Sequence, residues 1–205
     1  MRVGGGGGML PDMVDGARKR PLATAADLAR LPGEVRAEVV EGEVVEKAAP
    51  APDHADAQTG IVGYLRPPYQ STGGPGRPGG WWILAEVEIE VEAHEVYRPD
   101  VTGWRRDRVP ERPRERPVRV RPDWVCEVLS PSNASRDQVV KFRTFERNAV
   151  PHYWIVDPER RTLTVYRWAD GGYRVAVQAK DTETVRAEPF AEVEIRLGTL
   201  FGLED

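Results

Sequence analysis

Cysteine is almost missing from this chain of 205 residues, since Cys126 is its only one. A single cysteine excludes an internal disulfide and a zinc site built from several thiolates. Long apolar runs are missing too: no stretch approaches the roughly 20 residues that a membrane helix needs. The first residues, Met1 to Gly8, lack the apolar core of a secretory signal. We therefore expect a cytoplasmic protein with no membrane partner.

A strong surplus of one charge is also absent. Lys and Arg number 29 against 33 Asp and Glu, so the formal net charge is -4 and favours no general attraction to nucleic acid. Residues 98–121 are the exception, with nine arginines (98, 105, 106, 108, 112, 114, 116, 119, 121) against four acids (100, 107, 111, 115). Such a segment either meets a phosphate backbone or forms a solvated loop of mixed charge. The sequence leaves both interpretations open.

The chain is long enough for one well-buried core, with 40% hydrophobic residues. Residues 1–20 are glycine-rich, then mixed and basic, and we expect them to be disordered. Residues 21–205 are expected to form a single domain. A strand–helix–strand unit over 124–156, set among further strands, predicts an α/β fold whose middle strands carry the chemistry.

Apolar periodicity and turn residues predict the individual elements. Helices are expected at 25–31, at 52–65 with a stop at Pro67-Pro68, and from Ser135 onward. Residues 41–46 are expected to form a turn that leads into a strand. Further strands are expected at 81–92, 96–104, 124–129 and 153–156, followed by a hairpin of 162–168 with 173–178. In the strand 81–92 four glutamates alternate with apolar residues. We expect that row to be solvated, the alternative being arginines or a cation opposite it.

Three polar residues do not suit a purely structural interpretation. Glu127 interrupts the apolar run Trp124–Leu129, where a carboxylate is costly to bury without a partner. Asp100 follows Pro99 near a strand, and Lys141 lies on the helix after the central strand. Two carboxylates with a lysine suit a divalent metal ion and a phosphodiester, the lysine stabilising the charge that develops on phosphorus. Asp100 and Glu127 would be the metal ligands, with the Val128 carbonyl as a further candidate.

Other interpretations of these residues stay open. Asp123 also follows a proline, but it stands about 13 Å from Glu127 along one strand, so both cannot chelate one ion; we interpret it as a strand-start residue. Glu127 and Lys141 can form a structural ion pair, and Asp137 with Lys141 has the spacing of a helix pair.

The same residues carry a family resemblance. Residues 122–132 (PDWVCEVLSPS), then Asp137, Lys141 and residues 153–158 (YWIVDP), closely resemble the Uma-type restriction endonuclease family of bacteria, in the PD-(D/E)XK nuclease superfamily. The likeness extends to residues 99–106 (PDVTGWRR) and 37–45 (AEVVEGEVV), and it covers about 22–200.

The resemblance implies a restriction-endonuclease-like αββα core, a central mixed sheet flanked by helices. It places Asp100 as the aspartate of the PD motif, Glu127 at the acidic position, and Glu38 as a glutamate on an early helix that approaches the metal. The superfamily has lysine two residues after the acid, where this chain has Leu129. The lysine's role would therefore pass to Lys141. His54 stands where this branch often carries histidine; we expect an ordinary helix-start residue, with substrate contact as the alternative.

We therefore expect a metal-dependent endonuclease that cuts DNA, with Mg²⁺ or Mn²⁺ and no organic cofactor. A homodimer would help it cut both strands. A nuclease fold that binds nucleic acid or a partner protein without cutting is the second hypothesis, and a purely structural homo-oligomer is the third.

Overall fold

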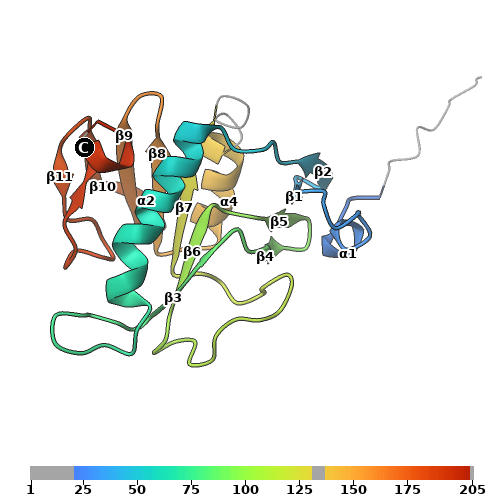
Figure 1. The fold of residues 1–205 in the computed structure, drawn as a ribbon. Helices are drawn as coiled ribbons and strands as arrows, with labels where there is room; N and C mark the ends of the chain where they lie inside the picture. Colours follow the sequence, from blue (N-terminus) through green and yellow to red (C-terminus); the bar gives the residue numbers. More distant parts are fainter. Residues whose placement is uncertain (1–20, 131–136, 204–205) are drawn as a thin grey trace, which may run out of the picture.

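The computed structural model describes residues 21–130 and 137–203, and its largest element is a mixed six-stranded sheet (Figure 1). In spatial order its strands are β10 (Gly172–Lys180), β9 (Thr162–Ala169), β8 (His152–Asp157), β7 (Trp124–Val128), β6 (Val101–Arg105) and β3 (Trp81–Ala85). Neighbouring strands are antiparallel except β7 and β8, which run parallel. A parallel pair needs a crossover, which here contains the π-helical turn η1 (Asp137–Lys141) and the helix α4 (Phe142–Arg147).

A four-stranded sheet adjoins the large one, in the order β2 (Glu43–Glu46), β1 (Ala37–Val40), β5 (Glu95–Tyr97) and β4 (Ile89–Glu92). β1 and β2 form a hairpin around Glu41 and Gly42, which both have positive φ. The short helix α1 (Ala25–Leu28) precedes it. Near the C-terminus lie a two-stranded sheet, β11 (Thr184–Val185) with β12 (Ile195–Arg196), and the helix α5 (Leu197–Leu200).

Helices lie on both faces of the six-stranded sheet: α2 (Pro52–Tyr69) crosses one face, and α4 lies on the other (Figure 1). Cys126 belongs to the core cluster that contains Ile61 of α2, whereas Val125 belongs to the cluster that contains Phe145 of α4. Because both faces of β7 are buried, the strand is apolar at every position except Glu127.

The predicted end of the second helix at Pro67-Pro68 is wrong, because α2 continues through both prolines to Tyr69. A proline in a helix lacks the amide hydrogen and crowds the carbonyl one turn earlier. Tertiary packing outweighs that cost here. Tyr69 is buried, its ring centroid lies 4.7 Å from that of Phe190, and its hydroxyl donates to Glu192 Oε2 at 2.6 Å.

The predicted strands 81–92 and 96–104 are each divided between the two larger sheets. The first is divided into β3 and β4, with Glu86 in the left-handed conformation (φ +55°) between them, and the second into β5 and β6. The central strand, its parallel neighbour β8 and the hairpin of β9 with β10 follow the predictions. The predicted disorder of residues 1–20 and the predicted helix start at Ser135 concern residues outside the described part.

The sequence predicts that the row of four glutamates is solvated. In the structure the row instead lies opposite cationic side chains, which is the alternative interpretation. The pairs are Glu86 with Arg36, Glu88 with Arg98 and Arg116, Glu90 with Arg119, and Glu92 with Arg147. The hydrogen bonds from Arg116 lower the pKa of Glu88 in spite of its partial burial. Within residues 21–130 and 137–203, no helix is both long and apolar enough to cross a membrane.

Candidate active site

Asp100 and Glu127 meet where β6 begins and β7 ends. Val101 pairs with Cys126 in the antiparallel register, so one further step places Asp100 opposite Glu127. Residues opposite each other in such a pair project to the same face with Cβ atoms about 5 Å apart. Both side chains are fully buried. The structure thus brings together the two carboxylates that the sequence singled out.

Asp100 is held as an anion by three donors. Its Oδ1 accepts a hydrogen bond from Lys47 Nζ at 2.8 Å, and its Oδ2 accepts one from the Val128 N–H at 2.7 Å. His54 Nε2 lies 3.3 Å from Oδ2. Burial opposes ionisation, but the contacts with His54 and Lys47 outweigh it and hold the pKa of Asp100 well below its usual range.

Lys141 joins two of the predicted acids. Its Nζ lies 2.9 Å from Glu38 Oε1 and 3.0 Å from Glu127 Oε1, and only 1% of its side chain is exposed. The lysine therefore points toward the site, as expected. The expectation that Glu38 lies on a helix is wrong, since it lies on β1. Its segment has paired β-branched valines on both sides of the Glu41-Gly42 turn, a pattern that favours a hairpin.

Two residues of the cluster were missed or undervalued in the sequence. Lys47 directly follows β2, and besides Asp100 its ammonium donates to the Arg98 carbonyl at 2.8 Å. Burial alone would lower the pKa of Lys47, but the negative charges of Asp100 and Glu127 raise it. Nothing in the sequence around Lys47 marks it as a site residue.

His54, expected to be an ordinary helix-start residue, is buried against Asp100. Its Nδ1 has no hydrogen-bond partner in the part of the chain that the structure describes. The family resemblance was the only feature of the sequence that pointed to this histidine.

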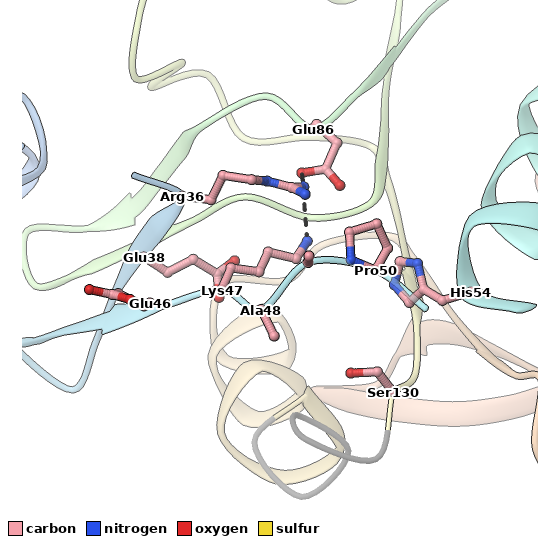
Figure 2. A pocket seen from close by; sticks show the side chains of 10 residues that line it. Arg36, Glu38, Glu46, Lys47, Ala48, Pro50, His54, Glu86 and Ser130 are labelled. Carbon is pink, nitrogen blue, oxygen red and sulfur yellow. Dashed lines mark ion pairs between the residues drawn. The ribbon is translucent and has the colours of Figure 1, made fainter. Parts of the chain in front are cut away.

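A cavity of about 70 Å³ adjoins the cluster, with Glu38, Lys47, His54, Glu86 and Ser130 in its lining. That volume holds a few water molecules. In Figure 2 the side chains of Lys47 and Arg36 both reach toward Glu86, at 3.7 and 2.5 Å from its Oε2. The cavity is therefore lined by charged groups from β1, from the end of β2 and from α2.

The donor set fits a hard divalent cation by its chemistry. Glu38, Asp100 and Glu127 supply buried carboxylate oxygens, the ligand type that Mg²⁺ prefers. Among the described residues, no three or more His, Cys, Asp or Glu side chains form a ready ligand cluster. Asp100 and Glu127, which lie opposite each other in the sheet register, fit a site of two carboxylates completed by water, which is common for Mg²⁺. In the structure the ammonium groups of Lys47 and Lys141 balance the buried carboxylates.

Asp123 lies outside this cluster, in agreement with its interpretation as a strand-start residue. It directly precedes β7, and its carboxylate accepts hydrogen bonds from the Arg105 N–H and from Arg108 Nε, both at 2.8 Å. Asp123 thus anchors the first turn of the arginine-rich segment and has no part in the candidate site.

Much of the arginine surplus of residues 98–121 is neutralised within the chain. Five of its arginines form ion pairs with acids: Arg98, Arg105, Arg108, Arg116 and Arg119. Arg106 stacks over the ring of Trp82, at 3.6 Å from the centroid. After β6 ends at Arg105, residues 106–121 are therefore a loop of mixed charge held to the protein surface.

Comparison with known proteins identifies the family of the chain. The model of the Uma2 family, described as "Putative restriction endonuclease", matches residues 25–199. The chain belongs to the Uma2 family. The resemblance to this family, inferred from residues 37–45, 99–106, 122–132 and 153–158 with Asp137 and Lys141, is thereby confirmed.

A solved structure has the same nuclease-like fold as this Uma2 protein. It comes from Anabaena variabilis ATCC 29413 and is described as "a putative nuclease belonging to DUF820". The TM-score is 0.68 at 22% sequence identity, and the alignment covers 88% of this chain and 98% of the other. At that identity the likeness concerns the fold alone. No curated protein matches the chain.

Proposed function

We propose that this Uma2 protein is a metal-dependent endonuclease that hydrolyses phosphodiester bonds in DNA. One observation carries the proposal: the buried residues Glu38, Asp100, Glu127 and Lys141 converge with Lys47 beside a cavity at one end of the central strands. Buried ion pairs contribute little net stability, so stability alone is a poor reason for such a cluster. Buried charges gathered at a cavity are typical of functional sites.

The proposed metal is Mg²⁺ or Mn²⁺, held by Asp100 and Glu127 with the Val128 carbonyl as a further candidate ligand. When bound, the ion would polarise the phosphoryl oxygen and acidify an attacking water. The chain's own groups prepare the site. The Val128 N–H and His54 orient the carboxylate of Asp100, and Lys141 holds the carboxylate of Glu127 beside Glu38.

The same proposal covers the finer details of the fold. We regard α2, the middle strands and α4 as the αββα core of the restriction-endonuclease-like fold, within a single domain of residues 21–205. Its support is the arrangement of helices on both faces of the sheet and the position of Glu127 on the central strand.

The test is calorimetric titration of Mn²⁺ and Mg²⁺ into the wild type, Asp100→Asn and Glu127→Gln, combined with nicking of supercoiled plasmid. Both substitutions keep side-chain size while removing an anionic ligand. Glu43→Gln is the matched control, because Glu43 lies on the exposed strand β2. We expect the two site variants to lose cation binding and nicking, and the control to keep both. Cleavage that survives in Glu127→Gln would refute the proposed site.

The second candidate function is a nuclease fold that binds nucleic acid or a protein without cutting it. The lysine contacts of Asp100 and Glu127 favour it, because they satisfy these acids without any metal. DNA binding that is unaffected by EDTA, with no nicking in either metal, would support it. A homodimer is part of the primary proposal, and analytical ultracentrifugation with and without DNA would test it. A structural homo-oligomer would bind no cation.

A further inference from the structure

We propose that Lys47, rather than Lys141, is the lysine that contacts the phosphate of the nucleic-acid substrate. The inference rests on the proposed nuclease function and assigns a role within that site. The sequence pattern indicated Lys141 because it follows the acidic strand, whereas nothing in the pattern indicated Lys47.

Within residues 21–130 and 137–203, the surroundings of Lys141 enclose its ammonium. It lies between Glu38 and Glu127, at 2.9 and 3.0 Å, and its Nζ lies 5.5 Å from the ring centroid of Tyr97. Its side chain is 1% exposed. Among the described residues that line the cavity, Glu38 is present and Lys141 is not. Lys141 is therefore the counter-ion that keeps two buried carboxylates in place.

Lys47 differs in its position and exposure. Its side chain lines the cavity (Figure 2). It is 9% exposed, compared with 1% for Lys141. It contacts Asp100 at 2.8 Å, so it both touches a proposed metal ligand and lines the cavity. A phosphate oxygen in the cavity would replace water and accept a hydrogen bond from this ammonium.

Lys47 also has a second anion within reach. Glu86 Oε2 lies 3.7 Å from its Nζ, compared with 2.8 Å to Asp100 Oδ1. A divalent cation on Asp100 would repel an ammonium that shares the same carboxylate. Loading with metal would therefore weaken the hold of Asp100 on Lys47 and leave its ammonium on the Glu86 side of the cavity.

Lysine methylation mapped by mass spectrometry tests this inference without measuring activity. Formaldehyde and a borane reductant would label the full chain alone, with Ca²⁺, and with Ca²⁺ plus supercoiled plasmid. We expect Lys47 to react faster when Ca²⁺ is added and to be protected when plasmid is added. Lys141 should stay unlabelled throughout, and the exposed Lys180 should react equally in all three samples.

Substitutions of Lys47 provide a second test of the inference. Lys47→Met should fold, bind Mn²⁺ at least as tightly as the wild type, and lose about 100-fold or more in the nicking rate constant. Lys47→Arg should restore part of that loss, since it keeps the charge. Such a loss in turnover, with cation binding intact, is not expected of a residue with a merely structural role.

Two results would overturn the inference. If the wild type binds and nicks plasmid, yet Lys47 is not protected or Lys47→Met cuts normally, Lys47 does not contact the phosphate and the proposed nuclease function stands. If the wild type binds neither cation nor plasmid, the proposed function fails and the inference fails with it.

Discussion

Glu38 and Lys141 are 103 residues apart in the sequence, and their side chains form a buried ion pair of 2.9 Å. The pair joins β1 of the four-stranded sheet to the π-helical turn η1 that follows the central strand. Because Lys141 also contacts Glu127, its ammonium connects Glu38 on the four-stranded sheet with Glu127 on the six-stranded sheet.

Removal of that ammonium should destabilise the protein strongly. Lys141→Met leaves two buried carboxylates without their cation, which costs about 3–5 kcal/mol of unfolding free energy. Urea denaturation followed by tryptophan fluorescence measures the change. The combined variant Lys141→Met/Glu38→Gln should recover part of the loss, because one uncompensated charge is removed. Lys180→Met, at an exposed position, should stay within about 0.5 kcal/mol of the wild type. Equal stability of Lys141→Met and the wild type would contradict this role.

Asp123 should prove to be a structural anchor. Asp123→Asn weakens the bonds to Arg108 and to the Arg105 N–H, and we expect a loss of about 1–3 kcal/mol. Amide hydrogen exchange should become faster in residues 105–121 while nicking activity is retained. Asp107→Asn is the control, since Asp107 pairs with Arg105 at the surface and should contribute less than about 1 kcal/mol. Loss of activity in a folded Asp123→Asn protein would instead make Asp123 part of the site.

Gly103 allows two tryptophans to pack against β6. A Cβ at this position would lie 3.0 Å from Trp124 Cε3 and 3.2 Å from Trp81 Cε3. Gly103→Ala should therefore cost about 1–3 kcal/mol through overpacking. Gly63→Ala offers the opposite case, because no described atom beyond the neighbouring backbone of α2 lies within 4 Å of its Cβ position. It should stabilise the protein by about 0.5–1 kcal/mol. Thermal denaturation should show a lower melting temperature for Gly103→Ala and a higher one for Gly63→Ala. An unchanged melting temperature of Gly103→Ala would contradict the tight packing.

His152 should make stability depend on pH. Burial is the main reason that its pKa falls from 6.5 to about 4; the nearby Glu188 and Asp123 oppose the shift, and Arg167 and Arg105 add to it. Below pH 6.5 the unfolded chain gains a proton on this residue that the folded chain does not, so folding loses stability as the pH falls toward 4. The full effect is at most about 3 kcal/mol. The urea midpoint measures this between pH 7 and pH 4. The wild type should lose stability as the pH falls, so its midpoint should approach that of His152→Gln, which lacks the titrating group. Parallel pH curves for the two proteins would refute the prediction.

The sequence by itself determined the elements whose causes are local. The apolar run 124–129 forms the central strand β7, and the turn at Asp170-Gly171 sets the hairpin of β9 and β10, with positive φ at both residues. Glu127 also stood out locally, as a charge within a strand that is buried on both faces.

Only the tertiary structure decided where distant groups meet. The contact of Lys47 with Asp100 spans 53 residues and depends on how the hairpin of β1 and β2 lies against the start of β6, which no local periodicity encodes. The continuation of α2 through Pro67 likewise follows from the packing of Tyr69 on Phe190. Periodicity and turns act over a few residues, whereas burial and ion pairing depend on the whole fold. The sequence therefore indicated the acids of the site and Lys141, whereas only the folded chain showed that Lys47 joins them.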